Sequence, residues 1–230
     1  MVQGIAAARL TILLFLLAIA SSLAAERKSL FNGKDLSGWQ IVGDGIWTVK
    51  KDGTLVGQRN PPSDPFPHRW PIDQKPYQRW WNSQSWLYTK EEFQEYDLEL
   101  DYWLPIGSNS GISIRDTSRA RYSYGAEDDP NRTPSHIGYE IQLIDTGQEE
   151  KYPSGSIYNF VPAKRGYERS NDWNHIEIES RDSVIRVRLN GTIVAESPGD
   201  PARPKRGPIG LQLHDQHTLA MFRNIRIRLR

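Results

Sequence analysis

The chain has no cysteine among its 230 residues. Without thiols there is no disulfide framework, no cysteine nucleophile and no lipoprotein cysteine, so the fold must be stabilised by packing. The chain also lacks a dominant charge, because 29 basic residues oppose 28 acidic residues and the formal net charge is +1. No basic cluster with interleaved aromatic residues is present, so we expect no nucleic-acid partner and an uncharged ligand.

Motifs of several common enzyme classes are absent as well. The sequence contains no Gly-x-Ser-x-Gly nucleophile elbow, no glycine-rich phosphate loop with lysine, and no dinucleotide fingerprint after a strand. These absences argue against serine-hydrolase and nucleotide chemistry.

The N-terminus has the pattern of a secretory signal peptide. Arg9 is the only charged residue before an apolar run at residues 10–20, and small residues at 22–25 offer a cleavage site. The run is shorter than the ~20 residues that span a bilayer, and no later segment is long enough. We expect a signal peptide at residues 1–25 and one mature domain at residues 26–230, periplasmic or secreted from a bacterium, without membrane contact after cleavage. An uncleaved anchor is the alternative.

Short β-patterned segments separated by glycine and proline dominate the rest of the chain, and no long segment has helical periodicity. The clearest are residues 176–179 and 185–189, whose alternation places Glu177 opposite Arg188 across a tight turn. Charged outer positions of this kind are typical of a sheet that faces water. The pattern predicts an all-β protein, a two-sheet antiparallel jelly-roll sandwich with such a back sheet.

Two other local features are expected. A short helix is predicted at residues 89–93, where Thr89 would be the cap and Glu92 would complete a capping box. A long loop rich in proline and tryptophan occupies residues 58–85. Trp81 in this loop could stack on a sugar ring, or the loop aromatics could cover a small satellite core.

Three segments combine apolar inward positions with unusual polar outward positions. The apolar positions are Ile112, Ile114, Tyr139, Ile141, Leu143, Ile209, Leu211 and Leu213. The polar positions are Arg115, Glu140, Gln142, Gln212 and His214. Because amides, a carboxylate, a guanidinium and an imidazole can hold a polyhydroxylated ligand and move a proton on it, we interpret this face as the functional surface.

These residues also have structural interpretations. Arg115 and Glu140 could form a salt bridge without catalytic meaning, and His214 could be a structural histidine. Asp116 and Asp145 end their segments, where capping a turn is the default expectation.

An acidic run offers a second possible site. Glu95, Asp97 and Glu99 have the spacing of the carboxylates in retaining β-glucanases of the laminarinase type. The favoured alternative is that they form the solvated side of an amphipathic strand.

Several segments together resemble the 3-keto-disaccharide hydrolase domain family, formerly a domain of unknown function. The most distinctive are Leu-Phe-Asn-Gly-Lys-Asp-Leu-Ser-Gly-Trp at residues 30–39, Gly-Pro-Ile-Gly-Leu-Gln at 207–212 and Phe-Arg-Asn-Ile at 222–225. Further matches lie at residues 86–93, 109–112, 139–142, 154–158, 172–174 and 189–191.

The resemblance implies a concanavalin A-like or laminin G-like sandwich that acts on glycosides oxidised to a ketone at C3. By motif position it implies a ligand face formed by Arg115, Glu140, Gln142, Asp145, Gln212 and His214. Tyr158, which ends the matched segment at residues 154–158, is expected to bind substrate as well.

A ketone at C3 acidifies the hydrogen at C2, so a base can remove it and the C1 substituent can then depart. Glu140 or His214 would be the base and the other the acid, while Arg115 with Gln142 or Gln212 would hold the enolate. Hydration of the product would complete net hydrolysis.

No cofactor is expected, and a divalent ion in the place of Arg115 is the alternative. The expected partner is a carbohydrate, and the sequence indicates no oligomeric state. Two rival functions remain, a non-catalytic, lectin-like carbohydrate-binding domain and a glycanase that uses Glu95, Asp97 and Glu99.

Overall fold

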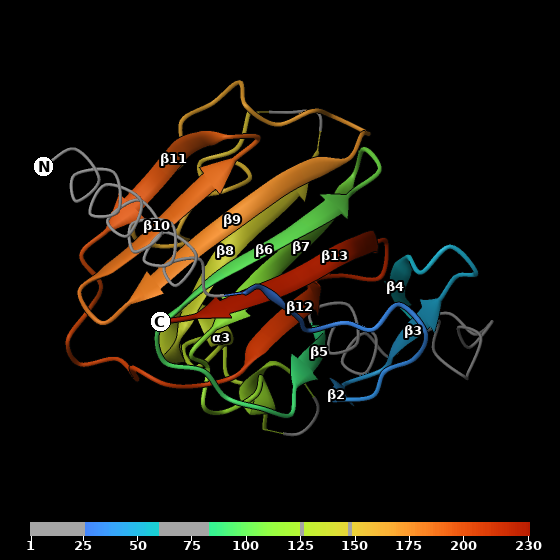
Figure 1. The fold of residues 1–230 in the computed structure, drawn as a ribbon, viewed down its shortest axis with the longest axis horizontal. Coiled ribbons are helices and arrows are strands. Elements are labelled where there is room, and N and C mark those ends of the chain that lie inside the picture. Colours follow the sequence, from blue (N-terminus) through green and yellow to red (C-terminus); the bar gives the residue numbers. More distant parts are fainter. Residues whose placement is uncertain (1–25, 60–82, 125–126, 147–148) are drawn as a thin grey trace, which may run out of the picture.

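A computed structural model describes residues 26–59, 83–124, 127–146 and 149–230. Across these ranges the chain is nearly all β, as Figure 1 shows. The predicted signal peptide and most of the proline- and tryptophan-rich segment, including Trp81, lie outside the described residues. The helices in these ranges lack the length and apolarity needed to cross a membrane.

The larger sheet, here called the back sheet, has eight antiparallel strands in the described residues. Its order is β11 (Thr192–Ser197), β10 (Val184–Leu189), β9 (Asn174–Arg181), β6 (Tyr96–Trp103), β13 (Leu219–Leu229), β4 (Leu55–Arg59) and β3 (Gly45–Val49), and β1 (Lys28–Ser29) also pairs with β13. The predicted hairpin register is confirmed, because Arg188 lies opposite Glu177 in the β9–β10 pair.

The smaller sheet, here called the front sheet, has five antiparallel strands within the ranges given above. Its order is β2 (Trp39–Val42), β5 (Ser85–Thr89), β12 (Ile209–Leu213), β7 (Ser108–Ile114) and β8 (Tyr139–Asp145). The two sheets overlap in the view of Figure 1. The predicted two-sheet antiparallel sandwich is therefore confirmed.

The core lies between the sheets and is formed by the inward positions of both. All eight apolar residues predicted to point inward from the front sheet are 0% exposed. They belong to one hydrophobic cluster with back-sheet residues such as Leu98, Ile176 and Val187. Strand alternation thus predicted the inner face of the front sheet correctly.

The helix predicted at residues 89–93 is wrong. Thr89 is the last residue of β5, and its hydroxyl group donates to the carbonyl of Glu91 at 2.8 Å and accepts from the amide of Ile209 at 3.0 Å. The hydroxyl therefore joins the end of β5 to the start of β12 instead of capping a helix. The short α-helix of the described chain is α3 (Pro134–Ile137), which begins with proline as helix starts often do.

Gly57 in β4 provides a test of the packing around Trp47. A Cβ atom at Gly57 would lie 2.6 Å from Cζ3 of the Trp47 ring, which is closer than atoms can approach. We expect Gly57→Ala to lower the free energy of unfolding by about 1–3 kcal/mol, as overpacking does, measured by urea denaturation. The matched control is the same change in a Trp47→Phe background, which lacks the contacted ring. An equal loss in both backgrounds would contradict this account.

Candidate active site

Part of the outer face of the front sheet is covered by the chain itself. Trp86 and Tyr88 point outward from β5, yet both are 0% exposed and pack with Ala120. Asp116 fixes the covering segment, because its Oδ2 accepts hydrogen bonds from the Tyr88 hydroxyl and the Ala120 amide, both at 2.7 Å. The turn-capping role expected of Asp116 is confirmed by its bonds to the amide and hydroxyl of Ser118.

A polar pocket of about 190 Å³ lies over the other side of this face, on β7 and β8. It is lined by four of the predicted site residues, Glu140, Gln142, Tyr158 and His214. Strand alternation and the family motifs therefore predicted residues that the fold does bring together.

Glu140 lies at the base of this pocket and is only 5% exposed. The space for its side chain comes from Gly111 of the neighbouring strand β7. A Cβ atom at Gly111 would lie 2.8 Å from Oε1 of Glu140 and 3.0 Å from Oε1 of Gln212. Only glycine lets these two side chains converge above β7.

The environment of Glu140 favours its neutral form. Burial raises its pKa, the charge of His214 and the amide of Gln212 lower it, Asp116 raises it, and the resulting pKa is about 7. No ion pair joins Glu140 to another described residue. The carboxyl group can therefore gain or lose a proton near neutral pH, as general acids and bases do.

Gln212 lies beneath the pocket rather than on its surface. The residue is 0% exposed, and neither amide atom has a hydrogen-bond partner in the described part of the chain. A buried amide without a partner is costly. Its position beside Glu140 makes it a donor that would stabilise the ionised carboxylate.

His214 is the second titratable group of the pocket, and 42% of its side chain is exposed. Its Nδ1 lies 3.4 Å from Oδ2 of Asp215. Burial acts to raise the pKa of Asp215, but hydrogen bonds from His214 and the His217 amide lower it, so Asp215 stays ionised near neutrality. A carboxylate at Nδ1 orients an imidazole and leaves Nε2 for proton exchange.

Gln142 and Tyr158 complete the predicted part of the lining. The Nε2 of Gln142 donates to Oδ1 of Asn109 at 3.2 Å. The Tyr158 amide donates to the carbonyl of Glu140 at 2.9 Å, which fixes it beside the acid. Burial, followed by the charge of Glu140 and by Tyr152, raises the pKa of Tyr158, so its phenol remains a hydrogen-bond donor.

The pocket also contains residues that the sequence did not reveal, among them Asn109, His136 and Asn159. His136 is in α3, and its Nδ1 lies 2.8 Å from the Thr133 hydroxyl. The sequence Thr133-Pro134 is a typical helix start and could have indicated the helix. The placement of α3 beside β8 depends on the tertiary fold.

Arg115 is not on the ligand face, and that prediction is wrong. Its φ of 62° is in the left-handed region, which ends the alternation of β7 and redirects the side chain. The guanidinium is 1% exposed and donates to the carbonyl of Arg181 at 2.7 Å, in the back sheet. No salt bridge joins Arg115 to Glu140, so that structural interpretation is also wrong.

Asp145 does not line the pocket either. Asp145 and Leu143 are two residues apart in β8, so they lie on the same face of the strand, and Leu143 points to the core. Its carboxylate accepts hydrogen bonds from the Ser170 hydroxyl at 2.9 and 3.1 Å and from the Asn171 amide at 2.8 Å. Asp145 thus holds a neighbouring turn, which agrees with the capping role.

The acidic run lies on the other sheet. Asp97 and Glu99 alternate with buried residues along β6, so the amphipathic-strand interpretation is confirmed. Glu95 accepts a hydrogen bond from the Asp182 amide at 2.9 Å. None of the three acids lines the front-sheet pocket.

The described residues contain no group of three or more His, Asp or Glu side chains arranged to hold a metal ion.

The two-sheet sandwich has the jelly-roll fold of galectin-like and β-glucanase structures. The chain belongs to the 3-keto-alpha-glucoside-1,2-lyase-like domain family, whose model matches residues 26–228. The resemblance seen in the sequence is confirmed by this match. Family membership indicates a carbohydrate-active function.

Solved structures similar to the chain share its fold. Two proteins from Parabacteroides distasonis ATCC 8503, both assigned as glycosyl hydrolases, are 24% and 20% identical, with TM-scores of 0.62 and 0.63. Each alignment covers 89% of this chain, and 100% and 94% of the respective relative. The Bacillus licheniformis β-glucanase is 11% identical with a TM-score of 0.52, over 90% of this chain and 99% of that one. Among curated proteins, none matches the chain.

The charge of His214 provides a test of the pocket electrostatics. Because His214 lowers the pKa of Glu140, we expect His214→Asn to raise that pKa further above 7, measured by carbon-13 NMR titration of the carboxyl group. His175→Asn is the matched control, since His175 pairs with Asp101 on the back sheet. A Glu140 pKa unchanged by His214→Asn, or lowered, would show that the two groups are not coupled.

Proposed function

We propose that the chain is an exported bacterial enzyme that cleaves 3-keto-glycosides, including disaccharides, by elimination. The observation that carries this proposal is the convergence of a half-exposed imidazole and a buried carboxyl group, one without an ion pair in the described part of the chain, in one polar pocket. Membership of the 3-keto-alpha-glucoside-1,2-lyase-like family supports the substrate class. The apolar N-terminal run followed by small residues supports export.

The chemistry requires one base and one acid. The base removes the C2 hydrogen, and the electron pair forms an enolate with the C3 ketone. The enolate then collapses, the bond from C1 to the glycosidic oxygen breaks, and the acid gives a proton to that oxygen. The product is an unsaturated ketone with a double bond between C1 and C2, and addition of water across this bond completes net hydrolysis.

Glu140 is suited to be the base. It has no counter-ion among the described residues, and its pKa of about 7 makes a carboxylate more basic than usual. Gln212 beside it can stabilise the ionised form. His214, oriented by Asp215, then supplies the proton to the departing oxygen.

Arg115 lies outside the pocket and cannot hold the enolate. Hydrogen-bond donors that line the pocket would take this role. The Tyr158 phenol is a donor that stays protonated. The Gln142 amide, positioned by Asn109, offers a second polar group for the ring hydroxyls. Donors positioned in advance stabilise charge as it develops.

The substrate test compares a glucoside with its 3-keto derivative. We expect the leaving group to be released from the keto compound alone. Its release is measured by chromatography of the products. Release from the plain glucoside would favour a glycanase that uses the acidic run, and release from neither would favour a carbohydrate-binding domain. The test therefore separates the three functions.

Substitutions in the pocket give a second prediction. Glu140→Gln should reduce kcat at least about 100-fold, the usual contribution of a general base, and should abolish deuterium exchange at C2. In the wild type, kcat/KM should rise with pH through about 7 as Glu140 ionises. Glu95→Gln is the matched control and should leave both readouts unchanged. Normal C2 exchange in the Glu140→Gln protein would rule out Glu140 as the base.

A further inference from the structure

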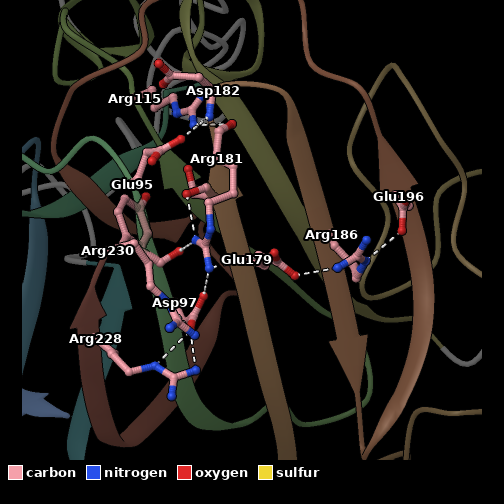
Figure 2. Close-up of polar contacts among 12 residues, drawn as sticks. Glu95, Asp97, Arg115, Glu179, Arg181, Asp182, Arg186, Glu196, Arg228 and Arg230 are labelled. Carbon is pink, nitrogen blue, oxygen red and sulfur yellow. Dashed lines mark hydrogen bonds and ion pairs between the residues drawn. The ribbon is translucent and has the colours of Figure 1, made fainter. Parts of the chain in front are cut away.

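A second hollow, of about 210 Å³, lies on the outer face of the back sheet, opposite to the active-site pocket. Six arginines and three acids line it, and two further acids pair with lining arginines, Glu99 with Arg27 and Glu196 with Arg186, which leaves a formal excess of one positive charge. We call it the arginine hollow; Figure 2 shows the part around Asp97, Arg181, Arg186 and Arg228. No aromatic side chain is among the described residues that line it.

Part of this charge compensates a local repulsion. Asp97 of β6 lies directly opposite Glu179 of β9, and like charges at such positions destabilise a sheet. Arg181 interacts with both, by a hydrogen bond to Asp97 and a 3.7 Å ion pair with Glu179. Arg186 binds Glu179 at 2.6 Å from the next strand. Arg181 and Arg186 alone would thus balance the charges of Asp97 and Glu179.

The network nevertheless holds more arginines than its acids require. Asp97 alone accepts hydrogen bonds from Arg181, Arg228 and Arg230, as Figure 2 shows. Burial acts to raise the pKa of Asp97, but these bonds lower it to about 2, which reports a strongly positive surrounding. Arg181 also pairs with Glu179, but Arg228 and Arg230 share the single charge of Asp97, so this pair keeps positive charge and unused N–H donors.

Arg188 makes the excess clearest. It lines the hollow and lies opposite Glu177 in the sheet, yet no ion pair joins it to any described residue. Its Nη1 donates only to the carbonyl of Gly191, at 3.1 Å. The remaining donors of this guanidinium are therefore open to an external acceptor.

We propose that the arginine hollow binds an anionic group, a sulfate ester or a carboxylate, carried by an acidic saccharide. Guanidinium groups recognise such oxyanions through paired N–H donors. The size of the hollow suits one substituent or one ring rather than a larger ligand. Without aromatic side chains it offers no stacking platform for nucleic-acid bases. That the anion is carried by a saccharide, and not by another molecule, rests on the proposed carbohydrate function.

Direct binding tests the proposal without turnover. A fluorescent heparin tetrasaccharide is titrated at low ionic strength into the wild type, Arg188→Gln and Arg188→Glu. We expect affinity to fall about fivefold in Arg188→Gln and more than about tenfold in Arg188→Glu, and an uncharged dextran tetrasaccharide not to bind. Because Arg188 makes no ion pair with a described residue, Arg188→Gln should unfold at the wild-type temperature, whereas Arg188→Glu should unfold slightly below it, since the new carboxylate lies opposite Glu177.

The matched control is Arg121→Gln, which removes one positive charge from the segment that covers the front sheet, where Arg121 pairs with Glu127. It should change affinity less than about twofold. Equal losses of affinity in Arg121→Gln and Arg188→Gln would contradict binding at the arginine hollow, since net charge alone would then explain it. If inorganic sulfate binds as tightly as the tetrasaccharide, the saccharide contributes nothing to recognition, and the proposal of a saccharide ligand is contradicted. Either failure leaves the elimination at Glu140 unaffected, because that reaction is assayed separately.

Discussion

Burial of a carboxyl group that forms no ion pair with any described residue is the constraint on which the active-site pocket depends. Glu140 extends from β8 over Gly111, and Gln212 from β12 closes the space on its other side. Water therefore stabilises the carboxylate less than at a surface and the proton is held more tightly, an effect that the charge of His214 only partly offsets. A side chain at position 111 would push the carboxyl group towards solvent and remove the property that makes it a useful base.

Glycines of the family motif at residues 207–212 serve this same architecture. A Cβ at Gly210 would lie 2.5 Å from Cε1 of Tyr88, and one at Gly207 would lie 2.7 Å from Cα of Arg115. Gly210 lets the Tyr88 ring lie flat on β12, where the Tyr88 hydroxyl reaches Asp116. The motif that distinguishes the family is thus largely structural, and it builds the covered half of the sheet beside which the pocket opens.

The sequence predicted the site well where the alternation of a strand continues and poorly where the backbone departs from it. The period of two placed Glu140 and Gln142 of β8 on one face, and it still held at His214, which directly follows β12. It failed at Arg115, where a left-handed residue reverses the side-chain direction just after β7. The helix expected at residues 89–93 failed because a threonine hydroxyl can join two strands as readily as it caps a helix. His136 could not be predicted, since its place beside β8 arises from a long-range contact.

The two faces of the sandwich show how the same functional group, a carboxyl group, acquires opposite properties. Asp97 and Glu140 both alternate with core residues on regular strands, so their local sequences are similar. Three arginines around Asp97 hold its pKa at about 2, whereas burial around Glu140 raises its pKa to about 7. A carboxyl group with a pKa near 2 is ionised at neutral pH and cannot donate a proton, and its charge is already engaged by guanidinium groups. Proton transfer therefore belongs to the front sheet, while the charge density of the back sheet is suited to binding.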